Sequence, residues 1–200
     1  MSTPIEFYFD FSSPYSYLAS EQIEPLAARY GRAIDYRPVL LGAAFKASGM
    51  LPLVDIPLKG DYSKRDFERS ARFAGVPFVL PRPFPIATVG AARAYLWLKD
   101  SDAQRALAFL HAAFRAYFAH ARNISENPVL ADVLRQVGAD PEPTLQAIQQ
   151  PAIKERLKAL VDASLARGVF GAPFLFVDGE PFWGHDRLPQ IERWLAAGPF

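Results

Sequence analysis

Two serines near the amino terminus lie at a predicted junction between a strand and a helix, where ligand-binding and catalytic residues are often found. Ser13 and Ser16 follow the apolar run from Ile5 to Asp10, which is predicted as a buried strand, and a helix is predicted from Pro14. In open α/β sheets, ligands bind at the carboxyl end of a strand, and the next helix points its free N–H groups there. Ser13 therefore has two interpretations: it caps the helix, or it donates its hydroxyl hydrogen to a ligand anion that the helix end also attracts.

The chain contains no cysteine. This excludes disulfide bonds, thiolate metal sites and any redox cycle on the protein's own sulfur. A serine hydroxyl cannot take over thiol–disulfide exchange at neutral pH, so sulfur chemistry beside Ser13 needs a thiol from outside, for which glutathione is the obvious cellular candidate. The sequence predicts no metal site, because His111 and His120 lie nine residues apart in one predicted helix and so cannot share a face.

Composition narrows the class of protein. Half of the 200 residues are hydrophobic and 22% are charged, which predicts one compact unit or a small domain carrying an insertion. The formal net charge is +1 and no long run of like charge is present, so nucleic acid is not expected as a partner. No apolar stretch reaches the roughly 18 to 20 residues that span a bilayer, and the first residues lack the layout of a signal peptide. We expect a cytoplasmic protein that does not bind membranes.

The elements that would position Ser13 alternate at both ends of the chain. A strand over 5–10, a helix from Pro14 to a stop at Gly31 and a strand over 33–39 predict a parallel pair joined by a right-handed crossover. Residues 42–150 show helix signals almost throughout. Residues expected to cap these helices are Thr88, Asp102, Asn127 before Pro128, and Asp140 before Pro141.

The last part of the chain returns to strands. A helix over about 151–167 is followed by the run Phe174 to Val177, the turn Asp178-Gly179, a second apolar run to Trp183 and a final helix over about 187–196. This order is thioredoxin topology with an interruption. The predicted fold class is α/β, a thioredoxin fold with a large α-helical domain inserted after the second strand. The predicted domains are 1–41 with 151–200, and 42–150.

Four blocks of sequence keep a fixed order over nearly the whole chain. They are residues 7–18 (FYFDFSSPYSYL), Lys59-Gly60-Asp61-Tyr62 with Asp66 and Arg69 downstream, residues 168–173 (GVFGAP), and residues 182–188 (FWGHDRL). This pattern resembles the 2-hydroxychromene-2-carboxylate isomerases and the similar kappa-class glutathione transferases. Thioredoxin-type oxidoreductases carry Cys-Pro-x-Cys where this chain has Ser13-Pro14-Tyr15-Ser16, so oxygen replaces both sulfurs.

The resemblance implies a glutathione site. The serine matching Ser13 is the catalytic residue and hydrogen-bonds the glutathione sulfur, which favours the thiolate. Pro173 matches a cis-proline, and Ala172 before it pairs its backbone with the glutathione peptide. His185 and Asp186 match a pair beside the γ-glutamyl end, where the carboxylate can hold the ammonium group. Lys59 matches a lysine that meets a carboxylate of glutathione or of the substrate.

Each implied role has a structural alternative. Asp186 is also placed to cap the last helix, Lys59 is also explained as a solvated surface lysine, and Pro173 as an ordinary trans turn proline. The family usually has Ser-Gly-Asn where this chain has Ser48-Gly49-Met50. Either Met50 packs on an apolar part of the ligand or another group supplies the missing hydrogen bond. Aromatic residues of the insertion either stack on the substrate ring or pack in the core: Phe45, Tyr62, Phe84, Phe114 and Tyr117.

The resemblance further implies an isomerase that converts 2-hydroxychromene-2-carboxylate-type substrates, which are small aromatic carboxylates, to trans-o-hydroxybenzylidenepyruvate-type products. A glutathione thiolate adds to a conjugated carbon, rotation follows, and elimination restores the double bond. This implies a role in aromatic compound degradation, and relatives tend to form homodimers. Two alternatives stay open: a kappa-class-like glutathione transferase that leaves the adduct in place, and a non-catalytic thioredoxin-fold binding protein.

Overall fold

A four-stranded sheet joins the first and last parts of the chain in the computed structural model, which describes residues 3–200. Its strands are β1 (Ile5–Phe9), β2 (Ile34–Pro38), β3 (Phe174–Val177) and β4 (Glu180–Trp183), in the order β2-β1-β3-β4. β1 and β2 run parallel, whereas β3 runs antiparallel to both β1 and β4. The predicted strand-helix-strand unit and the carboxyl-terminal hairpin are both confirmed.

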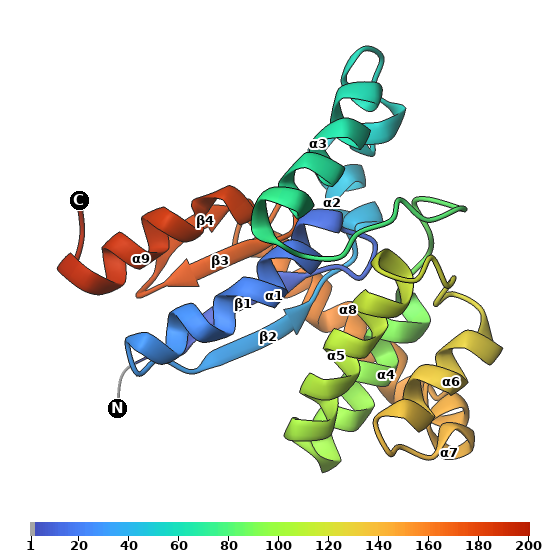
Figure 1. Cartoon of the computed structure of the whole chain (residues 1–200). Coiled ribbons are helices and arrows are strands. Elements are labelled where there is room, and N and C mark those ends of the chain that lie inside the picture. Colours follow the sequence, from blue (N-terminus) through green and yellow to red (C-terminus); the bar gives the residue numbers. More distant parts are fainter. Residues whose placement is uncertain (1–2) are drawn as a thin grey trace.

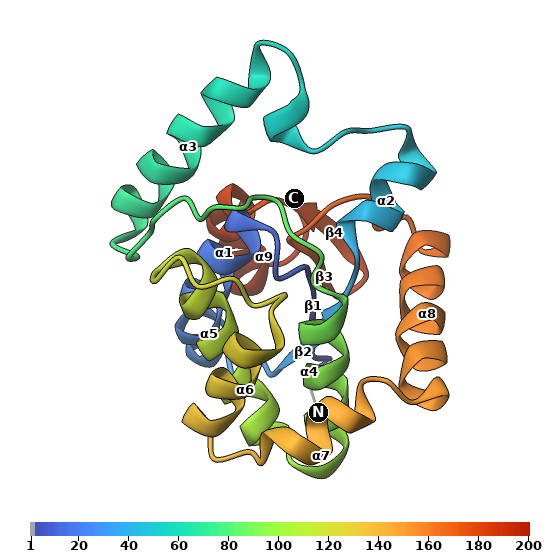
Figure 2. The same ribbon diagram turned by 90° about the vertical axis from the view of Figure 1, so that its right-hand side faces the viewer.

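Helices lie on both sides of this sheet. α1 (Pro14–Arg29) and α9 (Leu188–Ala197) lie on one side and α8 (Pro151–Ala166) on the other, as Figures 1 and 2 show. α1 starts at Pro14 because proline fixes the helical φ angle and has no N–H to leave unpaired in the first turn. The helix therefore begins directly above the carboxyl end of β1.

Every regular element between β2 and α8 is helical, as the sequence predicts. They are α2 (Leu41–Ser48), the 3₁₀ turn η1 (Leu53–Asp55), α3 (Lys59–Ala74), α4 (Val89–Ser101), α5 (Ala103–Phe118), α6 (Asn127–Gln136) and α7 (Pro141–Ala147). We call residues 41–74 the arm and residues 75–88 the return segment. The arm rises beyond the end of β2, and the return segment leads back to α4 (Figure 2).

Two of the four expected caps are confirmed. The Asp102 carboxylate accepts a hydrogen bond from the Arg105 N–H at 2.9 Å, and Asp140 likewise caps α7. Asn127 is not a cap, because the helix begins one residue earlier than predicted and Glu126 holds that position. Thr88 stands at the start of α4, but its hydroxyl donates to the buried Asp10 carboxylate at 2.6 Å and leaves the helix end uncapped.

The hydrophobic core runs without a break from the sheet into the inserted helices. The Phe9 ring of β1 lies 5.4 Å from the Tyr95 ring of α4 and 5.9 Å from the Phe114 ring of α5, centroid to centroid. The helical part therefore packs on the strand that carries the site. The division at 41/42 and 150/151 stays a prediction, and the first two residues of the 1–41 segment lie outside the described residues. No helix within residues 3–200 is long and apolar enough to cross a membrane.

Candidate functional site

Ser13 lies at the centre of a hydrogen-bonded junction between the start of α1 and the loop before β3. Its side chain is buried at 3% exposure. The hydroxyl donates to the Ala172 carbonyl oxygen at 2.8 Å and accepts from the Ser16 N–H at 3.1 Å. The bond from the Ser16 N–H confirms the helix-cap interpretation of Ser13, and the separate bond to Ala172 brings together two residues that the resemblance assigns to the glutathione site.

Polar groups without partners surround this junction. The Ala172–Pro173 peptide bond is cis, and the Ala172 N–H has no hydrogen-bond partner among residues 3–200. The Ser16 hydroxyl is fully buried and also has none. A buried polar group without a partner is costly, so such groups suit a bound ligand that completes them. Hydroxyl and backbone donors at a helix start fit a peptide that carries a thiolate.

Asp10 shapes the loop that carries Ser13. The Asp10 carboxylate accepts from the Ser12 N–H at 2.8 Å, and the Asp10 carbonyl accepts from the Ser13 N–H at 2.9 Å. Burial raises the pKa of Asp10, while hydrogen bonds from Leu41, Thr88 and Ser12 act in the opposite direction. The turn between β1 and α1 is therefore held by a side chain that solvent does not reach.

Tyr15 joins three elements beside Ser13. Its hydroxyl donates to the Asp66 carboxylate of α3 at 2.6 Å, and its ring stacks on the His185 ring at 4.7 Å and 7°. Burial raises the pKa of Asp66, but the hydrogen bonds from Tyr15 and Arg69 outweigh it and lower that pKa overall. Burial also lowers the pKa of His185, more than the negative charges of Asp186 and Asp66 raise it. His185 thus packs on the first turn of α1, and its place beside the γ-glutamyl end of glutathione stays a prediction.

One face of α3 continues from this contact toward the tip of the arm. Lys59, Tyr62, Asp66 and Arg69 follow at alternating steps of three and four residues, which places them on one side of the helix. The Arg69 guanidinium lies 5.4 Å from the centre of the Tyr62 ring and donates to the Tyr62 hydroxyl at 3.0 Å. Tyr62 is therefore linked to the junction through Arg69, Asp66 and Tyr15.

The predicted cation Lys59 stands at the outer end of that face. Its side chain is exposed, and within residues 3–200 its ammonium group has no hydrogen bond or ion pair. Lys59 is the first residue of α3, about 10 Å along the helix axis from Asp66 at 1.5 Å per residue. It does not contact Ser13, Ala172 or His185, so only a ligand that extends along α3 would join it to them.

Asp186 follows His185 in the 3₁₀ turn η2 (His185–Arg187). Its carboxylate lies 3.2 Å from the Arg187 guanidinium and its side chain is 58% exposed. No side chain caps α9, so the helix-cap interpretation of Asp186 is wrong. Gly184 is required here, because its φ is +113° and an added Cβ would lie 2.3 Å from an Asp186 carboxylate oxygen. The Gly184 N–H donates to the Pro173 carbonyl at 3.1 Å, which ties this turn to the Ala172–Pro173 loop.

The remaining predicted ligand contacts divide into two groups. Phe114 and Tyr117 are fully buried, which confirms core packing for both and excludes contact with a substrate ring. Phe45, Phe84 and Met50 are half-buried. Met50 follows α2, and the described contacts do not bring it to Ser13, Ala172 or His185; its backbone N–H donates to the Phe45 carbonyl at 3.1 Å. Its role against the ligand stays a prediction.

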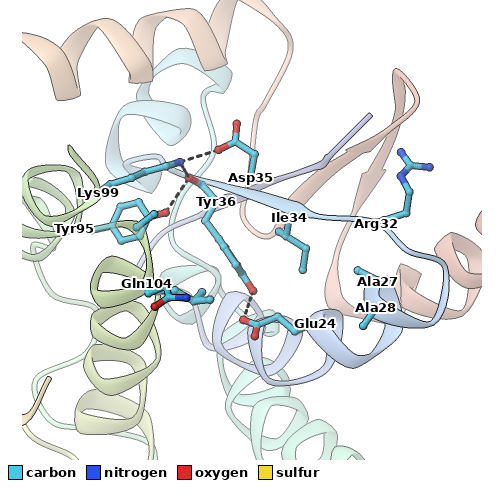
Figure 3. Close-up of a pocket in the computed structure, with 12 residues that line it drawn as sticks. Glu24, Ala27, Ala28, Arg32, Ile34, Asp35, Tyr36, Tyr95, Lys99 and Gln104 are labelled. Atoms are coloured by element: carbon cyan, nitrogen blue, oxygen red, sulfur yellow. Dashed lines mark hydrogen bonds and ion pairs between the residues drawn. The ribbon is translucent and has the colours of Figure 1, made fainter. Parts of the chain in front are cut away.

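A separate pocket of about 380 Å³ opens between α1, β2, α4 and α5 (Figure 3). The charged groups that Figure 3 draws there pair with the protein itself. Lys99 donates to the Asp35 carboxylate at 2.7 Å and to the Tyr36 carbonyl at 3.0 Å, and the Tyr36 hydroxyl donates to Glu24 at 2.9 Å. None of the predicted site residues lines this pocket, so the chemistry is expected at the Ser13 junction.

Sequence reasoning assigned no role to Asp10, Tyr15 or Asp66, although all three lie in the blocks that it singled out. A signal for Asp10 was present, because an aspartate two residues before a serine favours a turn held by the aspartate side chain. Nothing local could reveal the Tyr15–Asp66 contact, since the two residues are far apart in sequence and meet only when α3 returns over α1. Within residues 3–200, no group of His, Asp or Glu side chains lies close enough together to hold a metal ion.

Comparison with known proteins agrees with this geometry. The model of the DSBA-like thioredoxin domain matches residues 4–196. The chain is 32% identical over 203 residues to a 2-hydroxychromene-2-carboxylate isomerase of Sphingobium xenophagum, covering 98% of this chain and 99% of the relative. It is 31% identical to a glutathione S-transferase kappa 1 of Caenorhabditis elegans, covering 94% of this chain and 88% of the relative.

A solved structure of a 2-hydroxychromene-2-carboxylate isomerase superposes on the chain with a TM-score of 0.88 at 30% identity, covering 97% of this chain and 95% of the other. The match therefore includes the inserted helices as well as the sheet, which confirms the predicted fold class. The chain belongs to the DSBA-like thioredoxin-domain family and, within it, to the family of the 2-hydroxychromene-2-carboxylate isomerases.

Proposed function

We propose that this chain is a glutathione-dependent isomerase that converts 2-hydroxychromene-2-carboxylate-type substrates to trans-o-hydroxybenzylidenepyruvate-type products. One observation carries the proposal. In a chain without cysteine, the Ser13 hydroxyl lies at the start of α1, 2.8 Å from the carbonyl oxygen of Ala172 in the cis-proline loop, where a bound thiol would have to ionise. Relatives named 2-hydroxychromene-2-carboxylate isomerase match nearly the whole chain at 30 to 32% identity.

Glutathione, when bound, supplies a sulfur nucleophile that is also a competent leaving group. Ser13 would turn its hydroxyl hydrogen toward the sulfur and, with the positive end of the α1 dipole, hold it ionised. Ala172 would pair its backbone with the peptide, and Pro173 would set the direction of that backbone. Asp186 would hold the ammonium group, beside the His185 ring that rests on Tyr15.

The substrate would lie along the face of α3 that carries Lys59, Tyr62, Asp66 and Arg69. Tyr62 is 61% exposed and offers a ring face for stacking, while Lys59 offers a cation for a carboxylate of glutathione or of the substrate. Met50 would contribute apolar contact in place of the family's asparagine. The arm would thus supply recognition while the junction supplies ionisation.

The test is an isomerisation assay with and without glutathione, together with calorimetric titration of the purified chain with glutathione. We expect binding at millimolar concentration or tighter and turnover only when glutathione is present. A chain that does not bind glutathione would overturn the function while leaving the fold in place.

A second candidate is a transferase that conjugates glutathione to electrophiles, favoured by the 31% identity to a kappa-class relative. Both reactions need the same thiolate, so geometry does not separate them. Incubation with glutathione and an electrophilic aromatic halide decides the question, because only a transferase accumulates conjugate. Glutathione-dependent turnover of either kind would exclude the third alternative, a non-catalytic binding protein.

The proposal includes a role in aromatic compound degradation, a cytoplasmic location and a homodimer. Analytical ultracentrifugation would measure the oligomeric state directly.

A further inference from the structure

Asp10 is a buried carboxylate to which the proposed function gives no role. Its exposure is 4%, and its two oxygens accept three hydrogen bonds. One oxygen accepts from the Ser12 N–H at 2.8 Å and from the Thr88 hydroxyl at 2.6 Å. The other accepts from the Leu41 N–H at 2.7 Å. Because a buried donor left without an acceptor is costly, loss of any one of these contacts would weaken the attachment of its segment to Asp10.

The three donors belong to three different segments. Ser12 lies in the loop that carries Ser13, Leu41 is the first residue of the arm, and Thr88 is the last residue of the return segment. Leu40 at the start of α2 provides no side-chain cap, so Asp10 satisfies that helix end from elsewhere in the chain. The Ser12 hydroxyl adds a further attachment by accepting from the Ile86 N–H at 3.2 Å.

We propose that Asp10 is a positioning residue that fixes both ends of the 41–88 segment to the Ser13 loop and so keeps the arm in register with Ser13. The arm carries Lys59 and Tyr62 on a helix that projects away from the sheet, and a small rotation at Leu41 would move its outer end farther than its base (Figure 2). The carboxylate therefore sets where a ligand held at Ser13 meets those residues. Only the ligand measurements below rest on the proposed function.

Asp10→Asn is the first variant, because it keeps the size of the side chain and removes one acceptor. If the oxygen of the new side-chain amide accepts from Ser12 and Thr88, its NH₂ group faces the Leu41 N–H. Both groups are donors, so the hydrogen bond to Leu41 is lost. Leu41→Pro removes that N–H without disturbing the backbone, because proline is favoured at the first helical position and Leu40 already has the extended backbone that precedes proline. It also removes a side chain that packs on the cluster around Tyr8 and Val39, so Leu41→Ala is its control for lost packing. Thr88→Val removes the hydroxyl at the other end with little change in volume.

Hydrogen exchange of the arm amides is the readout that does not depend on glutathione. We expect Asp10→Asn and Leu41→Pro to speed exchange in residues 42–74 by about tenfold, the factor for roughly 1.4 kcal/mol, with exchange in β1 and β3 unchanged. Glutathione affinity should fall by about tenfold as well, with KM for glutathione rising more than kcat falls. Thr88→Val should act in the same direction and more weakly, because Ser12 still holds Ile86.

A double-mutant cycle tests the direct link. In the Leu41→Pro background Asp10→Asn no longer creates a clash of donors, so its effect on arm exchange should shrink by at least half. Strictly additive effects would overturn the proposal, as would exchange that rises equally in the arm and the sheet. If Asp10→Asn does not fold, unchanged arm exchange in both Leu41→Pro and Thr88→Val would overturn it in the same way. If the wild-type chain does not bind glutathione, the proposed function is refuted. The hydrogen-exchange result still decides whether Asp10 positions the arm.

Discussion

The Ser13 junction and the face of α3 that carries Lys59 and Tyr62 differ in how far solvent reaches their side chains. At the junction, Ser13 is buried and its hydroxyl both donates and accepts within the protein. On the arm, Lys59 and Tyr62 are exposed, and the Lys59 ammonium has no partner within residues 3–200. A rigid centre with a solvated recognition surface is the arrangement expected where one group must be pre-organised for chemistry and others adapt to a ligand.

The largest effect is expected at the junction. Ser13→Ala should lower turnover by about 10² to 10³-fold, the loss typical of one pre-organised donor, and should raise the pKa of the bound thiol. Steady-state kinetics and titration of the thiolate absorbance measure both. The variant also loses a helix cap, which costs about 1 kcal/mol of stability. Asp102→Ala loses a comparable cap on α5 and should keep full turnover; unchanged activity in Ser13→Ala would reduce Ser13 to a cap.

A half-buried polar cluster of His111, Glu21 and Glu24, away from both regions, should affect stability alone. Burial opposes the charge of His111, but Glu21 and Glu24 outweigh it and raise its pKa to about 9. The stabilisation is complete below the ordinary value of 6.5 and is lost as pH rises through 9, a change of up to roughly 3 kcal/mol. Urea unfolding across this range should show the decline in the wild type and not in His111→Gln. If the turnover of the folded enzyme fell over the same pH range in the wild type and not in His111→Gln, the cluster would affect activity as well as stability, and the prediction would be wrong.

On the arm, Lys59→Ala should raise KM for glutathione or for the substrate by about five- to tenfold with kcat nearly unchanged, as expected for one exposed charge pair formed with a ligand. Thermal stability should not change. Lys64→Ala is the matched control, because Lys64 lies on the same helix and pairs with Asp61 at 3.2 Å. Equal effects of both variants would show a general influence of charge on the arm and not a specific contact.

The smallest effect is expected where the two regions meet. Tyr15→Phe keeps the ring on His185 and removes the hydroxyl that donates to Asp66. The pKa of Asp66 should rise toward its ordinary value, because one of the hydrogen bonds that lower it is lost. We expect a two- to threefold rise in KM, roughly 0.5 kcal/mol, and carbon-detected NMR would follow the Asp66 titration. A loss as large as that of Ser13→Ala would move Tyr15 into the chemistry itself.

The sequence predicts much of the fold because its signals are local. The aromatic strand at Ile5, the cap and proline at Ser13-Pro14 and the Asp178-Gly179 hairpin each lie within a few residues, and all appear in the structure. The predicted start of α6 is wrong by one residue, because Asn127 and Glu126 are both acceptable before Pro128. The predicted Thr88 cap of α4 is wrong because the buried carboxylate of Asp10 competes for its hydroxyl.

The site is predictable in its parts and less in its connections. Residue types and the family resemblance point to Ser13, Ala172, Pro173 and His185, which the structure brings to one place. The attachments made by Asp10 and Tyr15 join segments from 31 to 78 residues apart in sequence. Such contacts depend on the path by which the helices return over the sheet. The periodicity and spacing of residues in the sequence do not predict that path.

The bond from Ser13 to Ala172 has a consequence for selectivity. A hydroxyl has one hydrogen, so an arriving anion takes it from the Ala172 carbonyl, and that carbonyl is left without a donor in a nearly dry place. A simple thiol would gain one contact and break another. Under the proposed function, a peptide thiol would bring its own N–H alongside the cis-proline loop and give that carbonyl a new donor, so we expect small thiols to bind more weakly than glutathione.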